Sequence, residues 1–370
     1  MKKSPAKSLP ACVVLLAGGR GTRFWPRSRT RTPKQLLNIV GRETMVRETV
    51  TRLQPLIADR NFWAVTNVEQ AQAMRRELRS VPAAHILTEP IGRNTAAAIG
   101  LAAIHLVRES GDALMAVLPS DSYIADAQAY RKLVRAALDL ARTPGNLIVL
   151  GVPPTRPETG YGHIEFGDVS AKLGGVKAYA VRRFTEKPAL PLAKKYVASR
   201  HFLWNAGMFF WRASTFLDCL KQFLPATHKA LGELAESIGT RGYAAALRRT
   251  YPRLENISVD YAVMEPATRR QSNVRVAVIP AKIGWSDIGS WAAVYELLAK
   301  KPGADVGASF SLDADGNYLW SQKKFVAAIG VHDLVLVETD DALLLCSRER
   351  SQDVGKIVKW LEDRKHHHLL

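Results

Sequence analysis

The chain has 370 residues, and 47% of them are hydrophobic, so it can bury a large core and has length for about two domains. Its longest apolar run, residues 11–17, is far shorter than the roughly 18 residues that a membrane-spanning helix needs. The formal net charge of +18 favours anionic partners, but the arginines match no zinc-finger, RNP or basic-zipper pattern. We therefore expect no membrane span and no nucleic-acid partner.

Three cysteines, Cys12, Cys219 and Cys346, lie far apart in the sequence. Their spacing matches neither a disulfide framework nor a zinc site, which indicates a reducing compartment, and we expect the cytoplasm. The closing histidines, residues 366–368, are expected to lie in a disordered tail.

The first half of the chain alternates β-rich runs with stretches of helical periodicity. Strands are predicted at residues 13–16, 62–66, 85–88, 114–118 and 147–152, and helices at 45–56, 70–78, 95–108 and 130–142. This alternation predicts an α/β fold with a Rossmann-like, mostly parallel mixed sheet that has helices on its faces. Ligands of such sheets bind beyond the carboxyl ends of the strands.

Further along the chain the pattern changes. Strands of an inserted sheet are expected at residues 161–166 and 176–184, helices at 212–223 and 242–249, short β-rich runs at 317–320, 325–329, 334–339 and 342–346, and a helix at 352–361. We expect a first domain over residues 9–298 and a small β-rich C-terminal domain over residues 303–363. The absence of a strict hexapeptide repeat argues against a long left-handed β-helix.

A glycine-rich segment, AGGRGTR at residues 17–23, follows the first predicted strand. Glycines let backbone N–H groups approach phosphates without obstruction, although the order matches neither a P-loop nor the G-x-G-x-x-G fingerprint. Arg23 and Lys34 add two cations close by in the sequence. They favour a phosphate cradle over the alternative, a purely structural glycine turn.

Five segments together carry a resemblance to a known family. They are GGRGTRFWPRSRTRTPKQL from residue 18, TEPIGRNTAAA from 88, FTEKP from 184, WNAGMFFW from 204 and GWSDIGSW from 284. In this order they resemble the sugar-1-phosphate nucleotidyltransferases, and within these the mannose-1-phosphate guanylyltransferase branch. The resemblance implies a nucleotidyltransferase fold and transfer of GMP from GTP to α-D-mannose 1-phosphate, giving GDP-mannose and pyrophosphate.

The resemblance also implies roles for particular residues. The nucleotide would be bound by Ala17, Gly18, Gly19, Gly21, Thr22, Arg23, Glu89, Gly92 and Asp121, the sugar phosphate by Gly160, Glu186, Lys187, Asn205 and Asp260, and a metal ion by Asp121 and Asp287, with Arg23, Lys34 and Lys187 as catalytic cations. Mg²⁺ is the expected ion, because it takes few carboxylates and several waters, and Mn²⁺ is an alternative.

Glu89 is the expected guanine contact, because a carboxylate can accept from both N1–H and the N2 amine of that base. A structural alternative is that Glu89 pairs with Arg93 or caps a helix at Thr95. Small departures from the family pattern, such as Ser122 where a histidine is usual and Arg27 where a leucine is usual, remove no proposed charge or ligand.

Three other functions remain in competition. They are a uridylyl- or thymidylyltransferase acting on glucose 1-phosphate, a catalytically silent nucleotide-sugar sensor, and an NAD-binding oxidoreductase. The oxidoreductase is disfavoured by the glycine spacing and because residues 66–67 supply no acidic ribose partner. The oligomeric state is left open, a homodimer included.

Overall fold

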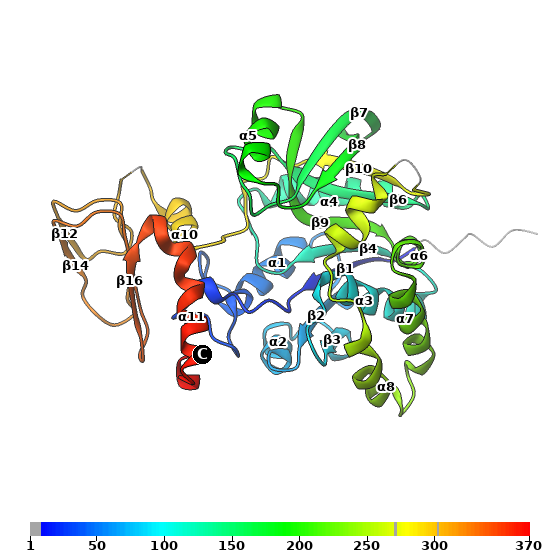
Figure 1. Ribbon diagram of the computed structural model, residues 1–370, viewed down its shortest axis with the longest axis horizontal. Coiled ribbons are helices and arrows are strands. Elements are labelled where there is room, and N and C mark those ends of the chain that lie inside the picture. The colour runs from blue at the N-terminus through cyan, green and yellow to red at the C-terminus, as the bar shows by residue number, and fades with distance from the viewer. Residues whose placement is uncertain (1–8, 270–271, 302) are drawn as a thin grey trace, which may run out of the picture.

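The computed structural model describes residues 9–269, 272–301 and 303–370. Its main element is a nine-stranded mixed sheet with helices packed on it (Figure 1). In spatial order the strands are β3 (Ile86–Glu89), β2 (Phe62–Asn67), β1 (Ala11–Leu16), β4 (Leu114–Pro119), β9 (Phe202–Arg212), β6 (Asn146–Val152), β10 (Arg275–Pro280), β8 (Val176–Thr185) and β7 (His163–Leu173). Strands β3, β2, β1 and β4 are parallel, as the alternating pattern predicted.

Three features of this sheet differ from the sequence prediction. Strand β9 runs antiparallel to both β4 and β6 in the middle of the sheet, where no strand was predicted. Strand β10 was also missed. The expected inserted sheet does not exist as a separate unit, because β7 and β8 continue the main sheet.

Two apolar layers cover the faces of the sheet, because successive residues of each strand point to opposite sides. In β1, Val14 packs into one layer, while Val13 and Leu15 pack into the other. The first layer is closed by α3 (Asn94–Ser110), α6 (Ala213–Phe223), α7 (Pro225–Ser237) and α8 (Tyr243–Thr250), and the second by α1 (Met45–Leu53), α2 (Ala71–Glu77) and α4 (Ala127–Ala141). Helix α5 (Leu190–Ser199) packs beside β9.

The C-terminal region follows α10 (Trp291–Leu298) and contains short strands. These are β12 (Phe310–Leu312), β13 (Tyr318–Trp320), β14 (Ala327–Ile329), β15 (Leu334–Glu338) and β16 (Leu343–Ser347), followed by α11 (Val354–Asp363). Strand pairs β12–β14 and β13–β15 are parallel, with Phe310 opposite Ala327 and Tyr318 opposite Val335. Parallel stacking of successive turns gives a short β-helix-like coil, which the sequence did not reveal.

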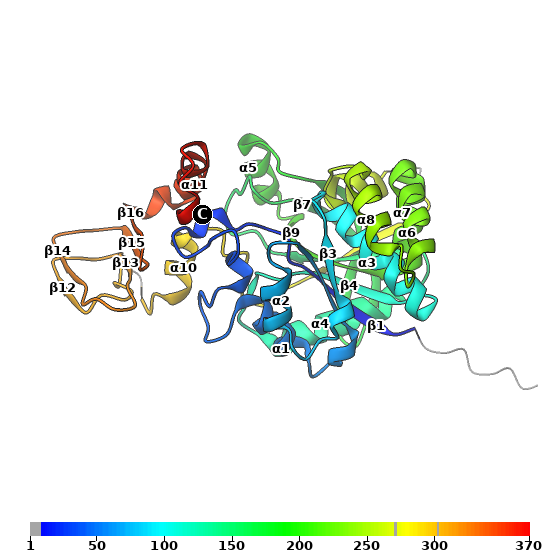
Figure 2. The ribbon, with the colours of Figure 1, turned by 90° about the horizontal axis from the view of Figure 1, so that it is seen from below.

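This region lies beside the segment after the glycine motif (Figure 2). A third apolar core joins the two. Phe24 packs edge-on against Trp291 at 5.0 Å between ring centroids, and Trp291 stacks on Tyr318 at 5.5 Å. The closing residues were expected to be disordered, but the structure gives them a defined conformation. His367–Leu369 forms a 3-10 turn, and Trp25 Nε1 donates to the Leu369 carbonyl. No helix in the described part of the chain is long and apolar enough to span a membrane.

Candidate active site

The glycine motif forms a loop between β1 and a short turn, Thr22–Phe24. Its carbonyl groups are held from the inner side: Thr66 Oγ1 donates to the Ala17 carbonyl at 3.0 Å, and Gln35 Nε2 donates to the Ala17 and Gly19 carbonyls at 2.9 and 3.0 Å. Among the described residues, the N–H groups of residues 18–21 have no internal acceptor. Such N–H groups form an anion-binding concavity.

Gly21 is required where it stands. Its φ of +59° lies in the left-handed region, and a Cβ built there would lie 2.5 Å from Lys34 Cβ. The loop therefore packs directly against the segment that carries Lys34, and a larger residue would separate the two.

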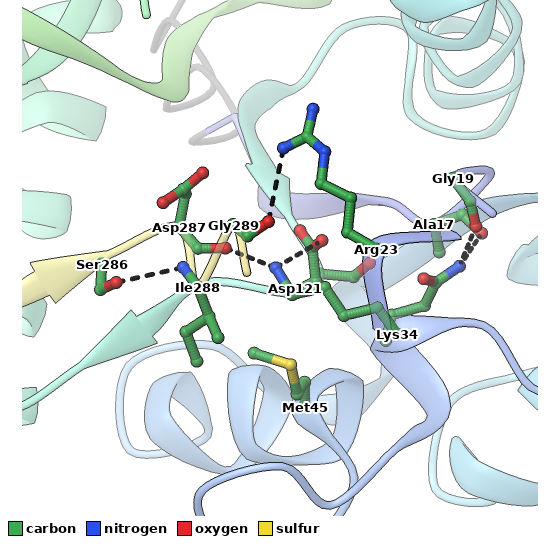
Figure 3. A network of polar contacts seen from close by, with 12 residues as sticks. Ala17, Gly19, Arg23, Lys34, Met45, Asp121, Ser286, Asp287, Ile288 and Gly289 are labelled. Carbon is green, nitrogen blue, oxygen red and sulfur yellow. Dashed lines mark hydrogen bonds and ion pairs between the residues drawn. The ribbon is translucent and has the colours of Figure 1, made fainter. Parts of the chain in front are cut away.

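Lys34 is 5% exposed and links two acidic segments (Figure 3). Its ammonium lies 3.0 Å from Asp121 Oδ2 and donates to the backbone carbonyl of Asp287. A short antiparallel ladder, β5 (Tyr123–Ile124) with β11 (Trp285–Ser286), brings the two aspartates together, since Asp121 precedes one strand and Asp287 follows the other.

The two aspartates form a donor set that fits a divalent ion. Both line one cavity of about 500 Å³, and Asp287 Oδ1 also accepts from Tyr161 Oη at 2.5 Å. In the described residues no three acidic, histidine or cysteine side chains form a metal cluster. Two carboxylates suit Mg²⁺, which usually takes its other ligands from water and substrate phosphates. Burial and the Asp287 charge raise the pKa of Tyr161, which keeps it a neutral donor.

Arg23 is exposed and lines the same cavity. Its Nη1 reaches the Gly289 carbonyl at 3.4 Å, which directs the guanidinium toward the Asp287 segment (Figure 3). The predicted cations Arg23 and Lys34 are thus brought to one site with both predicted metal ligands.

A second cavity, of about 340 Å³, adjoins the first at Asp121. Its lining includes the predicted nucleotide residues Ala17, Gly18, Gly19, Glu89, Gly92 and Asp121. Glu89 is 5% exposed, and its Oε1 accepts from Tyr251 Oη at 2.5 Å. Burial raises the pKa of this carboxyl, and hydrogen bonds from Tyr251 and from the backbone of Arg93 lower it in part.

The structural alternatives for Glu89 concern Arg93 and Thr95. The Arg93 guanidinium donates to the Pro252 carbonyl, so Glu89 contacts Arg93 through its backbone and is not the ion-pair partner of its side chain. The Thr95 N–H is bound by Asn94 Oδ1 at 2.9 Å, so Glu89 does not cap the helix at Thr95.

Four of the five predicted sugar-phosphate residues belong to the lining of the first cavity. Gly160, Glu186, Asn205 and Asp260 line it. Asn205 Nδ2 donates to Asp260 Oδ1 at 2.8 Å, while Asn205 Oδ1 accepts from the Gly207 N–H at 3.0 Å, which fixes the amide. Burial, together with the charge of Glu186, raises the pKa of Asp260 to about 7.

Lys187 is placed differently from the other predicted residues. Its side chain is 58% exposed, its ammonium pairs with Glu186 Oε1 at 3.1 Å, and it is absent from the cavity lining. Partial burial lowers its pKa, but the hydrogen bond and charge of Glu186 outweigh this effect and raise it.

Sequence reasoning missed the residues that hold the site in place. They include Gln35, Thr66, Tyr161, Tyr251 and Glu265, the last of which accepts from the Glu186 N–H at 2.8 Å. Only Gln35 carried a usable signal, because it directly follows Lys34 in the recognised segment.

Comparison with known proteins agrees with this geometry. The nucleotidyl transferase family matches residues 12–302, and the MannoseP isomerase/GMP-like beta-helix domain matches residues 307–361. A mannose-1-phosphate guanylyltransferase of Salmonella muenchen is 37% identical over 94% of this chain and 73% of its own length, and one of Escherichia coli K12 is 37% identical over 96% and 74%.

A solved structure extends the likeness to the backbone. A Thermus thermophilus protein described as a mannose-1-phosphate geranyltransferase is 31% identical, with a TM-score of 0.84 over 96% of this chain and 100% of that one. The likeness covers both the sheet and the C-terminal region. The chain therefore belongs to the mannose-1-phosphate guanylyltransferase family of nucleotidyl transferases.

Proposed function

We propose that this chain transfers GMP from GTP to α-D-mannose 1-phosphate, giving GDP-mannose and pyrophosphate. The observation that carries the proposal is the pair of adjoining cavities that meet at Asp121, with the glycine loop between them. One cavity offers an acidic base contact, and the other offers polar groups for a sugar. A nucleotide sugar, whose diphosphate joins a nucleoside to a sugar, fits this arrangement.

The base cavity favours guanine through Glu89. Its Oε2 faces Gly18, where an added Cβ would come within 3.1 Å, while Oε1 is held by Tyr251. A carboxylate fixed in this way can accept from guanine N1–H and N2 amine groups, and it repels the carbonyl oxygens of uracil and thymine. Gly92 also lines this cavity, and a Cβ there would meet nothing within 4 Å, so the base has room beside it.

The reaction needs positioning and charge neutralisation rather than a side-chain nucleophile. A sugar-phosphate oxygen attacks the α-phosphorus while the bond to pyrophosphate breaks. The loop N–H groups and the Lys34 ammonium would stabilise the charge on the phosphates, and Arg23 would act from the exposed side. Lys34 acts on the triphosphate in this scheme, whereas Lys187 acts on the sugar phosphate.

Members of this family generally depend on a divalent metal ion. We propose Mg²⁺, held by Asp121 and Asp287, with Mn²⁺ as an alternative. When bound, such an ion supplies Lewis-acid neutralisation of the phosphate oxygens. Tyr161 would orient the Asp287 carboxylate, because its hydroxyl already donates to Oδ1.

The sugar would lie against Gly160, Glu186, Asn205 and Asp260. Glu186 Oε2 is buried with no donor among the described residues, and a sugar hydroxyl would supply one. A silent sensor is the competing class, but Arg23, Lys34, Asp121, Lys187 and Asp287 are all present.

We also propose that residues 9–298 form the catalytic domain and residues 303–363 a separate small domain. A cytoplasmic location is proposed on two grounds, the use of GTP and the three cysteines, which are unpaired in the part of the chain described.

The decisive experiment measures pyrophosphate release with four nucleoside triphosphates, each combined with mannose 1-phosphate or glucose 1-phosphate. We expect the highest kcat/KM for GTP with mannose 1-phosphate. Preference for another pair would replace the proposed substrates, and no release from any pair would favour the silent sensor.

A further inference from the structure

A third cavity, of about 1110 Å³, lies on the outer side of the glycine loop. It shares no lining residue with the two cavities of the proposed reaction. Three parts of the chain form it: residues 20–32, helix α2 with the residues before it, and the end of α11 with the closing segment after it. Figure 1 shows the loop segment, in blue, between α2 and α11. We call it the arginine cavity, after Arg20, Arg29, Arg31 and Arg76 in its wall.

The arginine cavity has more positive than negative charge. Against four arginines and His367, its wall contains two acidic residues, Glu69 and Glu362, and the terminal carboxylate of Leu370. Glu362 is already paired with Arg20 at 2.5 Å. With His367 neutral, the lining still has one more cationic than anionic group.

Two guanidinium groups in this wall have no acceptor in the described part of the chain. Within the described residues, Arg31 and Arg76 form no ion pair and their side chains donate to no acceptor. Arg29 Nη2 pairs with Asp341 at 2.7 Å, so the charge of Arg29 is already balanced by a carboxylate outside the wall. Arg31 and Arg76 are therefore the two guanidinium groups that a bound anion would engage without breaking an existing ion pair.

We propose that the arginine cavity is a second binding site, which takes a small molecule with phosphate or diphosphate groups. Guanidinium forks match the geometry of phosphate oxygens and bind them in pairs of charge-assisted hydrogen bonds. The volume is ample for a ligand of nucleotide size. Nucleic acid is disfavoured because the cationic groups line a recess rather than an extended surface stripe.

Binding there is coupled to the glycine loop. Arg20 lies between Gly19 and Gly21, and its guanidinium is held by Glu362 of α11. A phosphate ligand would compete with Glu362 for Arg20. Because the Arg20–Glu362 ion pair ties the glycine loop to α11, breaking it would change the freedom of the loop N–H groups to move. The site would therefore regulate the use of GTP. This regulatory step rests on the proposed function, whereas the binding step does not.

The binding test uses isothermal titration calorimetry on the full chain. Pyrophosphate and inorganic phosphate are titrated in turn into metal-free protein saturated with GDP-mannose, so that the base and sugar positions are filled and the reverse reaction is blocked. Because pyrophosphate is also a product of the proposed reaction, only the anion binding that Arg76→Glu loses is assigned to the arginine cavity. GDP-mannose itself is titrated separately to obtain its stoichiometry. We expect one further anion to bind, with an affinity that falls as salt is raised.

Two variants make the assignment specific. Arg76→Glu reverses a charge in the arginine cavity, and Arg75→Glu makes the same change one residue earlier on α2, outside the lining. We expect Arg76→Glu to weaken the further binding at least tenfold and Arg75→Glu to leave it within about twofold. Both variants should keep the wild-type kcat and KM when no additional anion is present.

The outcomes separate the sources of the ligand. Two equivalents of GDP-mannose, one of them lost in Arg76→Glu, would assign the product as the ligand. One equivalent together with further pyrophosphate or phosphate binding that Arg76→Glu loses would assign a smaller phosphate anion. Equal binding by wild type and Arg76→Glu, or no further binding of any probe, would overturn the proposal. Failure of GDP-mannose to bind even Arg76→Glu would instead count against the proposed function.

Discussion

Single charges carry most of the chemistry of the site, and Asp121 and Asp287 provide the clearest test. Replacing either with Asn removes one negative charge at nearly constant shape. Turnover with Mg²⁺ should fall on the order of a hundredfold or more, because an electrostatic contact of this kind is lost. Steady-state kinetics and circular dichroism would separate this loss from misfolding. Asp168→Asn, at a side chain that is 99% exposed, is the control, and near-normal turnover in both site variants would contradict the metal assignment.

Base selection depends on Glu89. Glu89→Gln keeps an acceptor for Tyr251 but removes the charge that attracts guanine and repels the carbonyls of uracil. We expect the ratio of kcat/KM for GTP over UTP to fall about tenfold or more, since hydrogen bonds to charged groups contribute about 1.5–3 kcal/mol. Measuring kcat/KM for GTP, UTP and ATP in the wild type and in Glu89→Gln gives these ratios. Glu109→Gln, on the far end of α3, should leave the ratio unchanged, and an unchanged ratio in Glu89→Gln would refute the contact.

The pKa of Asp260 predicts a pH dependence on the sugar side. Burial and Glu186 raise that pKa to about 7, so the carboxyl is protonated below pH 7 and ionised above it. Ionisation places a second negative charge beside Glu186, where an anionic substrate must enter. The KM for mannose 1-phosphate should therefore rise between pH 6 and 8 in the wild type, relative to Asp260→Asn. If the ratio of the two KM values stays constant across this range, Asp260 does not titrate there.

At the scale of elements, the sequence predicted several strands that are nearly unbroken runs of hydrophobic residues. Strands β1, β2, β4 and β6 are buried hydrophobic runs, and each was predicted to within about two residues. Strand β9 was missed because its aromatic run resembles generic core packing, and no local signal says that it runs antiparallel inside the sheet.

In the site, too, the sequence predicted residues in local motifs and missed residues whose contacts are distant in the sequence. The predicted metal and base residues lie in recognisable motifs, whereas Tyr161 and Tyr251 reach their partners across sequence separations of 126 and 162 residues. Such contacts depend on the order of strands in the sheet, which single-residue patterns do not encode. The C-terminal coil was missed for a related reason, since its parallel pairs form without a strict repeat.

The turn of the glycine loop gives an element-scale prediction. Gly21→Ala puts a Cβ 2.5 Å from Lys34 Cβ and forces a left-handed backbone on alanine. The backbone alone costs about 1–2 kcal/mol, and the clash adds to it. We expect a lower Tm, measured by differential scanning calorimetry, together with impaired turnover because Lys34 moves. Gly19→Ala is the matched control for stability, since a Cβ there meets nothing within 4 Å.

At the scale of the whole molecule, one apolar core ties the C-terminal helix to the segment that carries the glycine loop. Leu361 of α11 is 4% exposed and belongs to the core that contains Phe24, Trp25 and Trp291. Leu361→Ala should destabilise the fold by about 2–5 kcal/mol, the usual cost of such a cavity. Because α11 also packs on the turn at Thr22 through Gly355, the same variant should raise the KM for GTP.

The neighbouring Trp360 provides the control for this prediction, because it is 51% exposed and lies outside that core. Trp360→Ala should leave the Tm and the KM for GTP close to those of the wild type. Calorimetry and GTP kinetics on the two variants would measure both effects together. If Leu361→Ala lowered the Tm while the KM for GTP stayed unchanged, the C-terminal region would stabilise the fold without positioning the glycine loop, and the coupling between the two would have to be abandoned.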